Sequence, residues 1–246
     1  GLMVREIGIR GVGLLSALRV FFTANLGRYL PGKLWQIAGL AFLARGEGVS
    51  PGTATGAAIL GQGFALAGAT LLGAGVLLEG GAGGGLWGGW GAPILLVVLL
   101  AVTSPVLLKR LLPLWFRLAR QGEPGGFRPD SAFGVRWMGL YALSWLGQGV
   151  AFFLLARGLG FEITLLEGVP SYAAAYVVGY LALFAPAGVG VREGMIVVLL
   201  GPSLGAGAAV LALAARLWAT VVEVVPAVAF GSKYLRSGEK GGSEVV

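Results

Sequence analysis

The chain has 246 residues, of which 57% are hydrophobic and only 12% are charged, and its mean hydropathy is +0.85. Soluble domains carry about 25% charged residues, so this composition excludes an ordinary soluble fold. The absence of cysteine and histidine excludes disulfides, thiolate nucleophiles, histidine-based triads and Cys/His zinc sites. The net charge of +7 is typical of basic membrane loops that contact anionic lipid, and we expect no nucleic acid partner.

Five long runs of the chain contain no Asp, Glu, Lys or Arg. They cover residues 48–78, 80–108, 137–156, 168–191 and 194–215. Each run is long enough to cross a hydrocarbon core of ~30 Å, which takes about 20 helical residues. The sequence therefore predicts an all-α, polytopic membrane protein with about six spanning helices and two short re-entrant or interfacial helices.

The first half begins with a predicted helix at 7–26, whose two arginines favour packing against other helices over full exposure to lipid. A break at Pro31 and Gly32 follows, and then about a dozen apolar residues, too few for a full crossing. Ser50 and Pro51 are typical of an N-cap and first-turn proline and predict a spanning helix at 51–78. Small residues that favour close helix packing recur along one face of this helix, at Ala57, Gly61, Ala65, Ala69 and Gly73.

The second half follows a glycine-rich loop whose tryptophans, Trp87 and Trp90, we expect at the level of the lipid headgroups. The most polar loop, at 109–136, is basic and is assigned to the cytoplasm. A second short apolar helix is predicted at 193–200, and the polar tail at 233–246 is expected to fray. The remaining predicted spans are 94–108, 133–155, 170–184 and 206–230.

The two halves of the chain show a similar order of features. In each, a helix leads into a proline-glycine break, then a short apolar helix, a proline turn and a span rich in small residues. Pro31 corresponds to Pro186, and Gln62 and Arg216 lie 31 and 30 residues further on. Such paired interruptions indicate a transport site at a repeat interface. We therefore divide a membrane domain at 1–232 into repeat halves at about 7–112 and 133–230, either parallel or inverted.

Four charged residues, Arg192, Glu193, Arg216 and Glu223, lie inside or next to long apolar stretches of the second half. A charge at a helix centre costs at least ~2.5–3.5 kcal/mol on insertion scales, so it is expected to face a partner or a watery cavity. Arg216 and Glu223 share one helical face but lie about 10 Å apart along the axis. We therefore expect Arg216 to pair with Glu193, or Glu223 to pair with Arg192. The cluster is either a structural set of ion pairs or part of a substrate site, and the two roles are compatible.

The stretch APAGVGVREG, at 185–194, predicts a helix break at membrane depth. A helix that starts near Arg192 would direct free N–H groups and its positive dipole end into this break. An anion-binding pocket follows, for which a lipid phosphate is the natural ligand. Tyr172, Tyr176 and Tyr180 could line its wall, although tyrosines at this spacing more often serve packing. The expected binding residues are Lys33, Gly188, Gly190, Arg192, Glu193, Arg216 and Glu223, with Pro31, Gly32 and Pro186 forming the breaks.

No motif in the chain predicts catalysis, a metal or a cofactor. GRYLPGKL approaches the phosphate-binding loop of nucleotide hydrolases, but Leu34 stands where that loop needs a hydroxyl for magnesium. Transport would therefore be facilitated or coupled to an ion, and Glu193 or Glu223 could carry a proton. We expect the protein not to be an enzyme. If it were one acting alone, only its carboxylates could do acid–base work.

Two segments, NLGRYLPGKLWQIAGL and P-x-G-x-G-x-R-E at 186–193, together with Arg216, resemble the transmembrane, flippase-like region of bacterial lysylphosphatidylglycerol synthases. The resemblance implies a stand-alone member, without the aminoacyl-transfer domain, in the cytoplasmic (inner) membrane. Such a protein would bind and flip an anionic phospholipid or another lipid-linked substrate.

The alternative is a non-transporting membrane subunit that holds an envelope glycosyltransferase or lipid-modifying enzyme through the basic loop. Expected partners are thus the lipid substrate, bulk membrane lipids, and either a second copy of the chain or an envelope enzyme.

Overall fold

The computed structural model describes residues 13–29, 34–79, 131–182 and 185–241, with a few separate positions between 93 and 110. Every regular element in these residues is a helix, which agrees with the predicted all-α class. The predicted helix break at Pro31 and Gly32, together with Lys33, lies outside the described residues. Most of the predicted span at 94–108 and of the basic loop at 109–136 also lies outside them.

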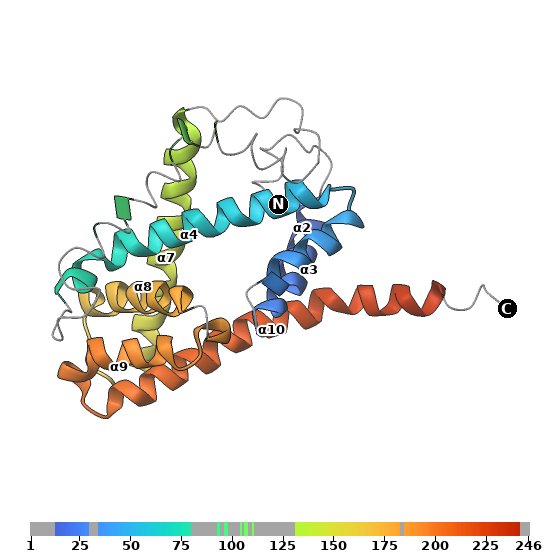
Figure 1. The fold of residues 1–246 in the computed structure, drawn as a ribbon. Helices are drawn as coiled ribbons and strands as arrows, with labels where there is room; N and C mark the ends of the chain where they lie inside the picture. Colours follow the sequence, from blue (N-terminus) through green and yellow to red (C-terminus); the bar gives the residue numbers. More distant parts are fainter. Residues whose placement is uncertain are drawn as a thin grey trace.

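The described elements follow one another as α-helices interrupted by two short 3-10 helices, η1 and η2 (Figure 1). In chain order they are α2 (Leu14–Asn25), η1 (Leu26–Tyr29), α3 (Leu34–Arg45), α4 (Pro51–Glu79), α7 (Ser131–Gly158), α8 (Leu165–Leu181), η2 (Pro186–Gly188), α9 (Val191–Leu204) and α10 (Gly207–Gly241).

Four stretches of the described helices are long and apolar enough to cross a membrane: Pro51–Leu77, Ala132–Gly158, Pro186–Leu204 and Gly207–Phe230. They support a multi-pass membrane protein, but the predicted count of six spans is not confirmed. The 12 residues of α3 rise only ~18 Å, which is too short for a crossing. The stretch that contains α9 is itself long enough to span, so its length does not confirm a re-entrant helix.

Local side-chain contacts fix where two of these helices begin. Ser50 Oγ accepts a hydrogen bond from the Thr53 amide at 3.3 Å, as expected for the N-cap of α4. The predicted start of the next-to-last span at Pro170 is wrong. Thr164 and Glu167 form a reciprocal capping box, so α8 begins at Leu165 and Pro170 lies inside it. Pro170 has no N–H to donate to the Leu166 carbonyl, so α8 continues through it with one backbone hydrogen bond fewer.

The last two helices are longer than the sequence predicts. The helix α9 begins at Val191 and continues past Pro202 to Leu204, where Gly205 ends it with a φ of +54°. The helix α10 continues beyond residue 232 to Gly241, through much of the segment expected to fray. The polar tail is therefore continuous with the last helix over these residues.

The small residues of α4 pack against α7 and α8, as their spacing predicts. A Cβ at Gly73 would lie 2.8 Å from the Ala174 amide nitrogen of α8, so only glycine allows this approach. On the α7 side, Trp145 Nε1 donates to the Ala65 carbonyl at 2.7 Å. Ala69 is fully buried between these contacts. This face holds α4 close enough to its neighbours to form one wall of the interior.

Six helices pack in a closed ring, which Figure 1 shows with α4 and α10 on opposite sides. In order around the ring they are α4, α8, α9, α10, α2 and α3, and α7 packs against α4 and α8. The order α2–η1–α3–α4 is the same as the order α8–η2–α9–α10, while the internal repeat itself stays a prediction. Each long helix, α4 or α10, packs on the first helix of the other half. The ring therefore places η1 and η2 in contact on the inside.

Candidate functional site

A cavity of about 900 Å³ lies inside the ring and is lined by residues from every element just described. Its size falls within the ~300–1,000 Å³ typical of ligand pockets. The polar residues on its wall are Asn25, Arg28, Tyr29, Gln36, Gln62, Tyr141, Ser144, Gln148, Tyr172, Tyr176, Tyr180, Arg192, Arg216, Thr220 and Glu223. The rest of the wall is apolar or aromatic, so the cavity offers a few polar groups in a hydrophobic setting.

The predicted helix break at 185–194 is present and forms one edge of this cavity. The helix α8 ends at Leu181, and α9 does not begin until Val191. Gly188 has a φ of +71°, and a Cβ there would lie 3.0 Å from the Gly179 carbonyl oxygen of α8. Ala187 also lies in the left-handed region, at φ 50° and ψ 20°, although it is not glycine. This conformation costs an L-residue about 1–2 kcal/mol, so neighbouring contacts must hold it.

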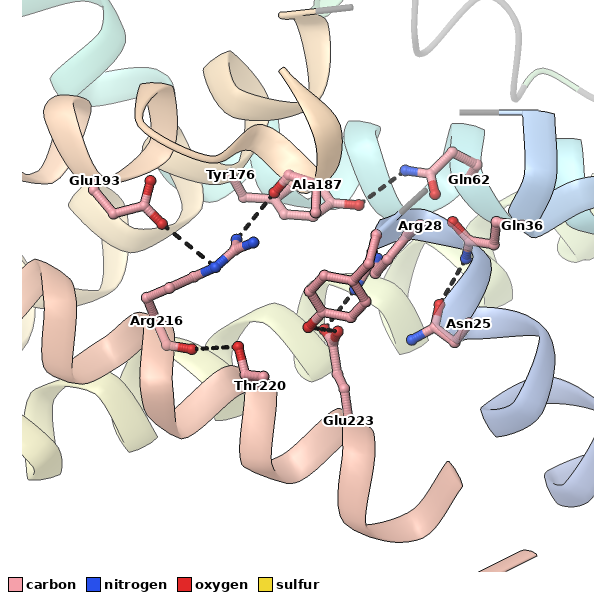
Figure 2. A network of polar contacts seen from close by, with 11 residues as sticks. Asn25, Arg28, Gln36, Gln62, Tyr176, Ala187, Glu193, Arg216, Thr220 and Glu223 are labelled. Carbon is pink, nitrogen blue, oxygen red and sulfur yellow. Dashed lines mark hydrogen bonds and ion pairs between the residues drawn. The ribbon is translucent and has the colours of Figure 1, made fainter. Parts of the chain in front are cut away.

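Arg216 supplies such a contact. Its Nη1 donates to the carbonyl oxygen of Ala187 at 3.0 Å, and its Nε lies 3.6 Å from Glu193 Oε1 (Figure 2). The other Glu193 oxygen accepts from the Gly190 amide at 2.7 Å and caps α9. The expected pair between Arg216 and Glu193 is therefore present, and together these side chains hold both ends of the break.

Glu223 does not pair with Arg192, which is the other of the two pairings that the sequence allowed. Its Oε1 accepts from Arg28 Nη1, and its Oε2 accepts from the Tyr29 hydroxyl at 2.8 Å (Figure 2). The reason is that α10 passes α2 and η1 at this level, whereas Arg192 turns toward α8. One carboxylate of α10 therefore ties the last helix to the first break.

Arg192 is held by aromatic rings. Its Cζ lies 4.5 Å from the centroid of Tyr172 and 5.7 Å from that of Tyr176. Among the residues that the structure describes, none forms a hydrogen bond or ion pair with its guanidinium. A void of about 10 Å³, room for roughly one water, separates it from Arg216 and Glu193. Tyr172 and Tyr176 thus both pack in the core and line the cavity wall. They also hold the Arg192 guanidinium at that wall.

Amide side chains form a further polar group on the wall. Gln36 Nε2 of α3 donates to Asn25 Oδ1 of α2 at 2.6 Å (Figure 2). Gln62 Nε2 of α4 donates to the Tyr176 hydroxyl at 2.9 Å. Sequence reasoning singled out Gln62 only as the counterpart of Arg216 and did not identify Asn25, Gln36, Arg28 or Tyr29 as site residues. The sequence feature that could have identified these four residues is that polar residues lie on both sides of the predicted break at Pro31 and Gly32.

The remaining predicted site residues are placed as follows. Gly190 has a φ of +82° and open space around it, next to the first turn of α9. Pro186 begins η2. Within the described ranges, no group of three His, Cys, Asp or Glu side chains comes together, so those residues show no cluster suited to a metal ion.

One comparison with known proteins gives a result. A family model described as Lysylphosphatidylglycerol synthase TM region matches residues 2–230, which is nearly the whole chain. No curated protein and no solved structure matches it.

Proposed function

The chain belongs to the lysylphosphatidylglycerol synthase transmembrane-region family, and we propose that it binds an anionic phospholipid or lipid-linked substrate in the ring cavity and carries it across the cytoplasmic membrane. The observation that supports this most is the state of Arg192. Its guanidinium lines a cavity among apolar helices, with no described hydrogen-bonding partner.

The charges on the wall favour an anion. Arg28 is paired with Glu223, and Arg216 is paired with Glu193. Among the described residues, this leaves the positive charge of Arg192 without a compensating carboxylate. An unpaired charge at membrane depth is costly, and a phosphate would complement it through two parallel hydrogen bonds from the planar fork.

Stacking on Tyr172 and Tyr176 prepares Arg192 for this role. The rings restrict the guanidinium and attract its charge through their faces, while its N–H edges remain available. Less side-chain freedom is then lost when a phosphate binds. Arg216 is already engaged with the break, so its main part is to hold the wall on which Arg192 lies.

Passage across the membrane requires the cavity to open toward one leaflet and then the other. The two 3-10 helices lie in contact on the inside of the ring, and each interrupts a helix. Segments without continuous helical hydrogen bonding are the ones that can move while the long helices stay intact. We therefore assign the gating movement to η1 and η2, with transport driven by the substrate gradient or by a coupled ion.

The alternative of a non-transporting scaffold would need a well-filled interior whose arginines all have partners. Arg216 meets this expectation through Glu193 and Ala187. Arg192 does not, and the cavity reaches it. These observations favour transport over a scaffold.

The test is exchange of fluorescent lipids between leaflets in liposomes that contain the purified full chain. We expect Arg192→Ala to lower the exchange of anionic lipid about 10- to 100-fold, as loss of charged hydrogen bonds predicts. Arg157→Ala is the matched control, because Arg157 is exposed in the last turn of α7 and does not line the cavity. Equally slow exchange by the wild type and Arg192→Ala, across all lipid classes, would refute the proposal.

A further inference from the structure

The cavity has a second kind of polar surface, made of uncharged amide groups, which the phosphate site does not use. We infer that the ligand is an anionic lipid whose headgroup is otherwise uncharged and rich in hydroxyl groups, and that Asn25, Gln36 and Gln62 bind this headgroup. The inference rests on the proposed function and names the substrate class of the same cavity.

The first support is the amide pair of the first half. Asn25, only 9% exposed, ends α2, and Gln36 lies in the first turn of α3, so their hydrogen bond joins the two sides of the first break. Each amide has one acceptor oxygen and an NH₂ group with two donors. With Gln36 donating to Asn25, the Asn25 NH₂ and the Gln36 oxygen have no other partner among the described residues. Figure 2 shows the Asn25 nitrogen turned away from Gln36.

The second support is the link between the amides and the arginine site. Gln62 donates to the hydroxyl of Tyr176, whose ring also lies 5.7 Å from the Arg192 guanidinium. The oxygen of Gln62 is thereby left as an acceptor on the cavity wall. A ligand with its phosphate at Arg192 would find the neutral amide of Gln62 on the other side of the Tyr176 ring. Hydroxyl groups suit such a surface because each can donate to an amide oxygen and accept from an amide nitrogen.

The third support is the state of the carboxylates. Among the described residues, Glu223 is the carboxylate on the cavity wall, and its two oxygens are taken by Arg28 and Tyr29. An ammonium group on the headgroup would lack a free carboxylate there, or it would displace Arg28 and leave that guanidinium unpaired. Both outcomes are costly in an apolar setting. The wall therefore disfavours aminoacylated or other cationic headgroups.

The experiment measures binding of short-chain lipids to the full chain in detergent, by competition against a fluorescent phosphatidylglycerol. The competitors share their acyl chains and differ in the headgroup: phosphatidylglycerol, phosphatidic acid and lysyl-phosphatidylglycerol. We expect phosphatidylglycerol to bind about 3- to 10-fold more tightly than phosphatidic acid, as one or two neutral hydrogen bonds predict, and lysyl-phosphatidylglycerol to bind most weakly. Soluble glycerol 3-phosphate should not compete at the concentrations where the lipids do.

Substitutions test whether the amide side chains cause the preference for phosphatidylglycerol over phosphatidic acid. Asn25→Leu and Gln62→Leu, on different helices, should each reduce the preference for phosphatidylglycerol over phosphatidic acid and leave the affinity for phosphatidic acid unchanged. Arg192→Ala should weaken both lipids. Thr70→Val is the matched control, because Thr70 is fully buried and does not line the cavity. A merely structural role for the amides would instead weaken all lipids equally and overturn the inference.

The comparison of lipids on the wild type needs no variant and separates the two proposals. Tight, Arg192-dependent binding in which lysyl-phosphatidylglycerol equals or exceeds phosphatidylglycerol would overturn the headgroup inference and leave the proposed function standing. Equal affinity for phosphatidic acid and phosphatidylglycerol would do the same. Competition by glycerol 3-phosphate as strong as that by the lipids would overturn the assignment to a lipid. Absence of any charge-dependent lipid binding would refute the proposed function itself.

Discussion

Replacing Ala187 with glycine should strengthen the second break, because it relieves the left-handed backbone at φ 50°. That conformation costs an L-residue about 1–2 kcal/mol and costs glycine almost nothing. Glycine adds about 0.5–1 kcal/mol of chain entropy to the competing open state. With both terms near the middle of their ranges, the net gain for the closed break is roughly 0.5–1 kcal/mol, which is about a 2- to 5-fold lower population of the open one.

The same variant tests the role of Arg216, whose hydrogen bond to the Ala187 carbonyl holds the strained residue. A charged hydrogen bond of this kind contributes about 1.5–3 kcal/mol. Arg216→Gln should therefore open the break, and adding Ala187→Gly should recover part of the loss. The recovery would be smaller than the loss, because the relieved strain is smaller than the hydrogen bond that Arg216 provides.

Thiol labelling measures this opening directly. The chain has no cysteine, so Ala185→Cys, immediately before η2 and only 4% exposed, provides a single reporter that is shielded while the break is closed. Its labelling rate should rise in Arg216→Gln and fall about 2- to 5-fold when Ala187→Gly is added. Arg157→Gln should leave the rate unchanged. A labelling rate that rises with Ala187→Gly would refute the reasoning, since it would mean that glycine loosens the break and that Ala187 is not under strain.

Three further predictions concern stability in detergent, measured as the midpoint of thermal unfolding. Gly188→Ala should lower the midpoint by several degrees, because its Cβ would meet a carbonyl oxygen at a positive φ, whereas Gly194→Ala, with open space around it, should not. Gly73→Ala should destabilise the packing of α4 on α8, while Gly75→Ala, two residues on and without close neighbours, should be neutral or stabilising. Glu223→Gln should destabilise the protein by about 1–3 kcal/mol, because it leaves a partly buried arginine of η1 without its carboxylate; an unchanged midpoint would show that this pair is solvated.

The sequence predicts those structural features that are determined by residues close together in the chain. The helix break at Pro186 follows from local glycine and proline conformations, and the small residues of α4 follow from a spacing of four. The pairing of Arg216 with Glu193 was also within reach, because a short connection joins α9 to α10 and forces the two helices to pack together. These inferences need no knowledge of how distant parts of the chain meet.

The partners of Glu223 could not be predicted from neighbouring residues. Arg28 and Tyr29 are nearly 200 residues away, and their contact depends on how α10 crosses α2. Hydropathy does not reveal that crossing, because a helix in lipid is apolar on all sides and shows no face that must be buried. Uncharged amides such as Asn25 and Gln36 stand out even less, since they cost far less in a membrane than a charge does.

The closed ring has a consequence for how the protein is made. The contact between α2 and α10 joins the first described helix to the last, and Arg28 and Glu223 are 195 residues apart. During synthesis the early helices enter the membrane long before α10 leaves the ribosome, with Arg28 still lacking its carboxylate. The cavity is therefore completed only when α10 is inserted. A chain that stalls before Glu223 would leave Arg28 without its carboxylate, at the cost of an unpaired charge among apolar helices.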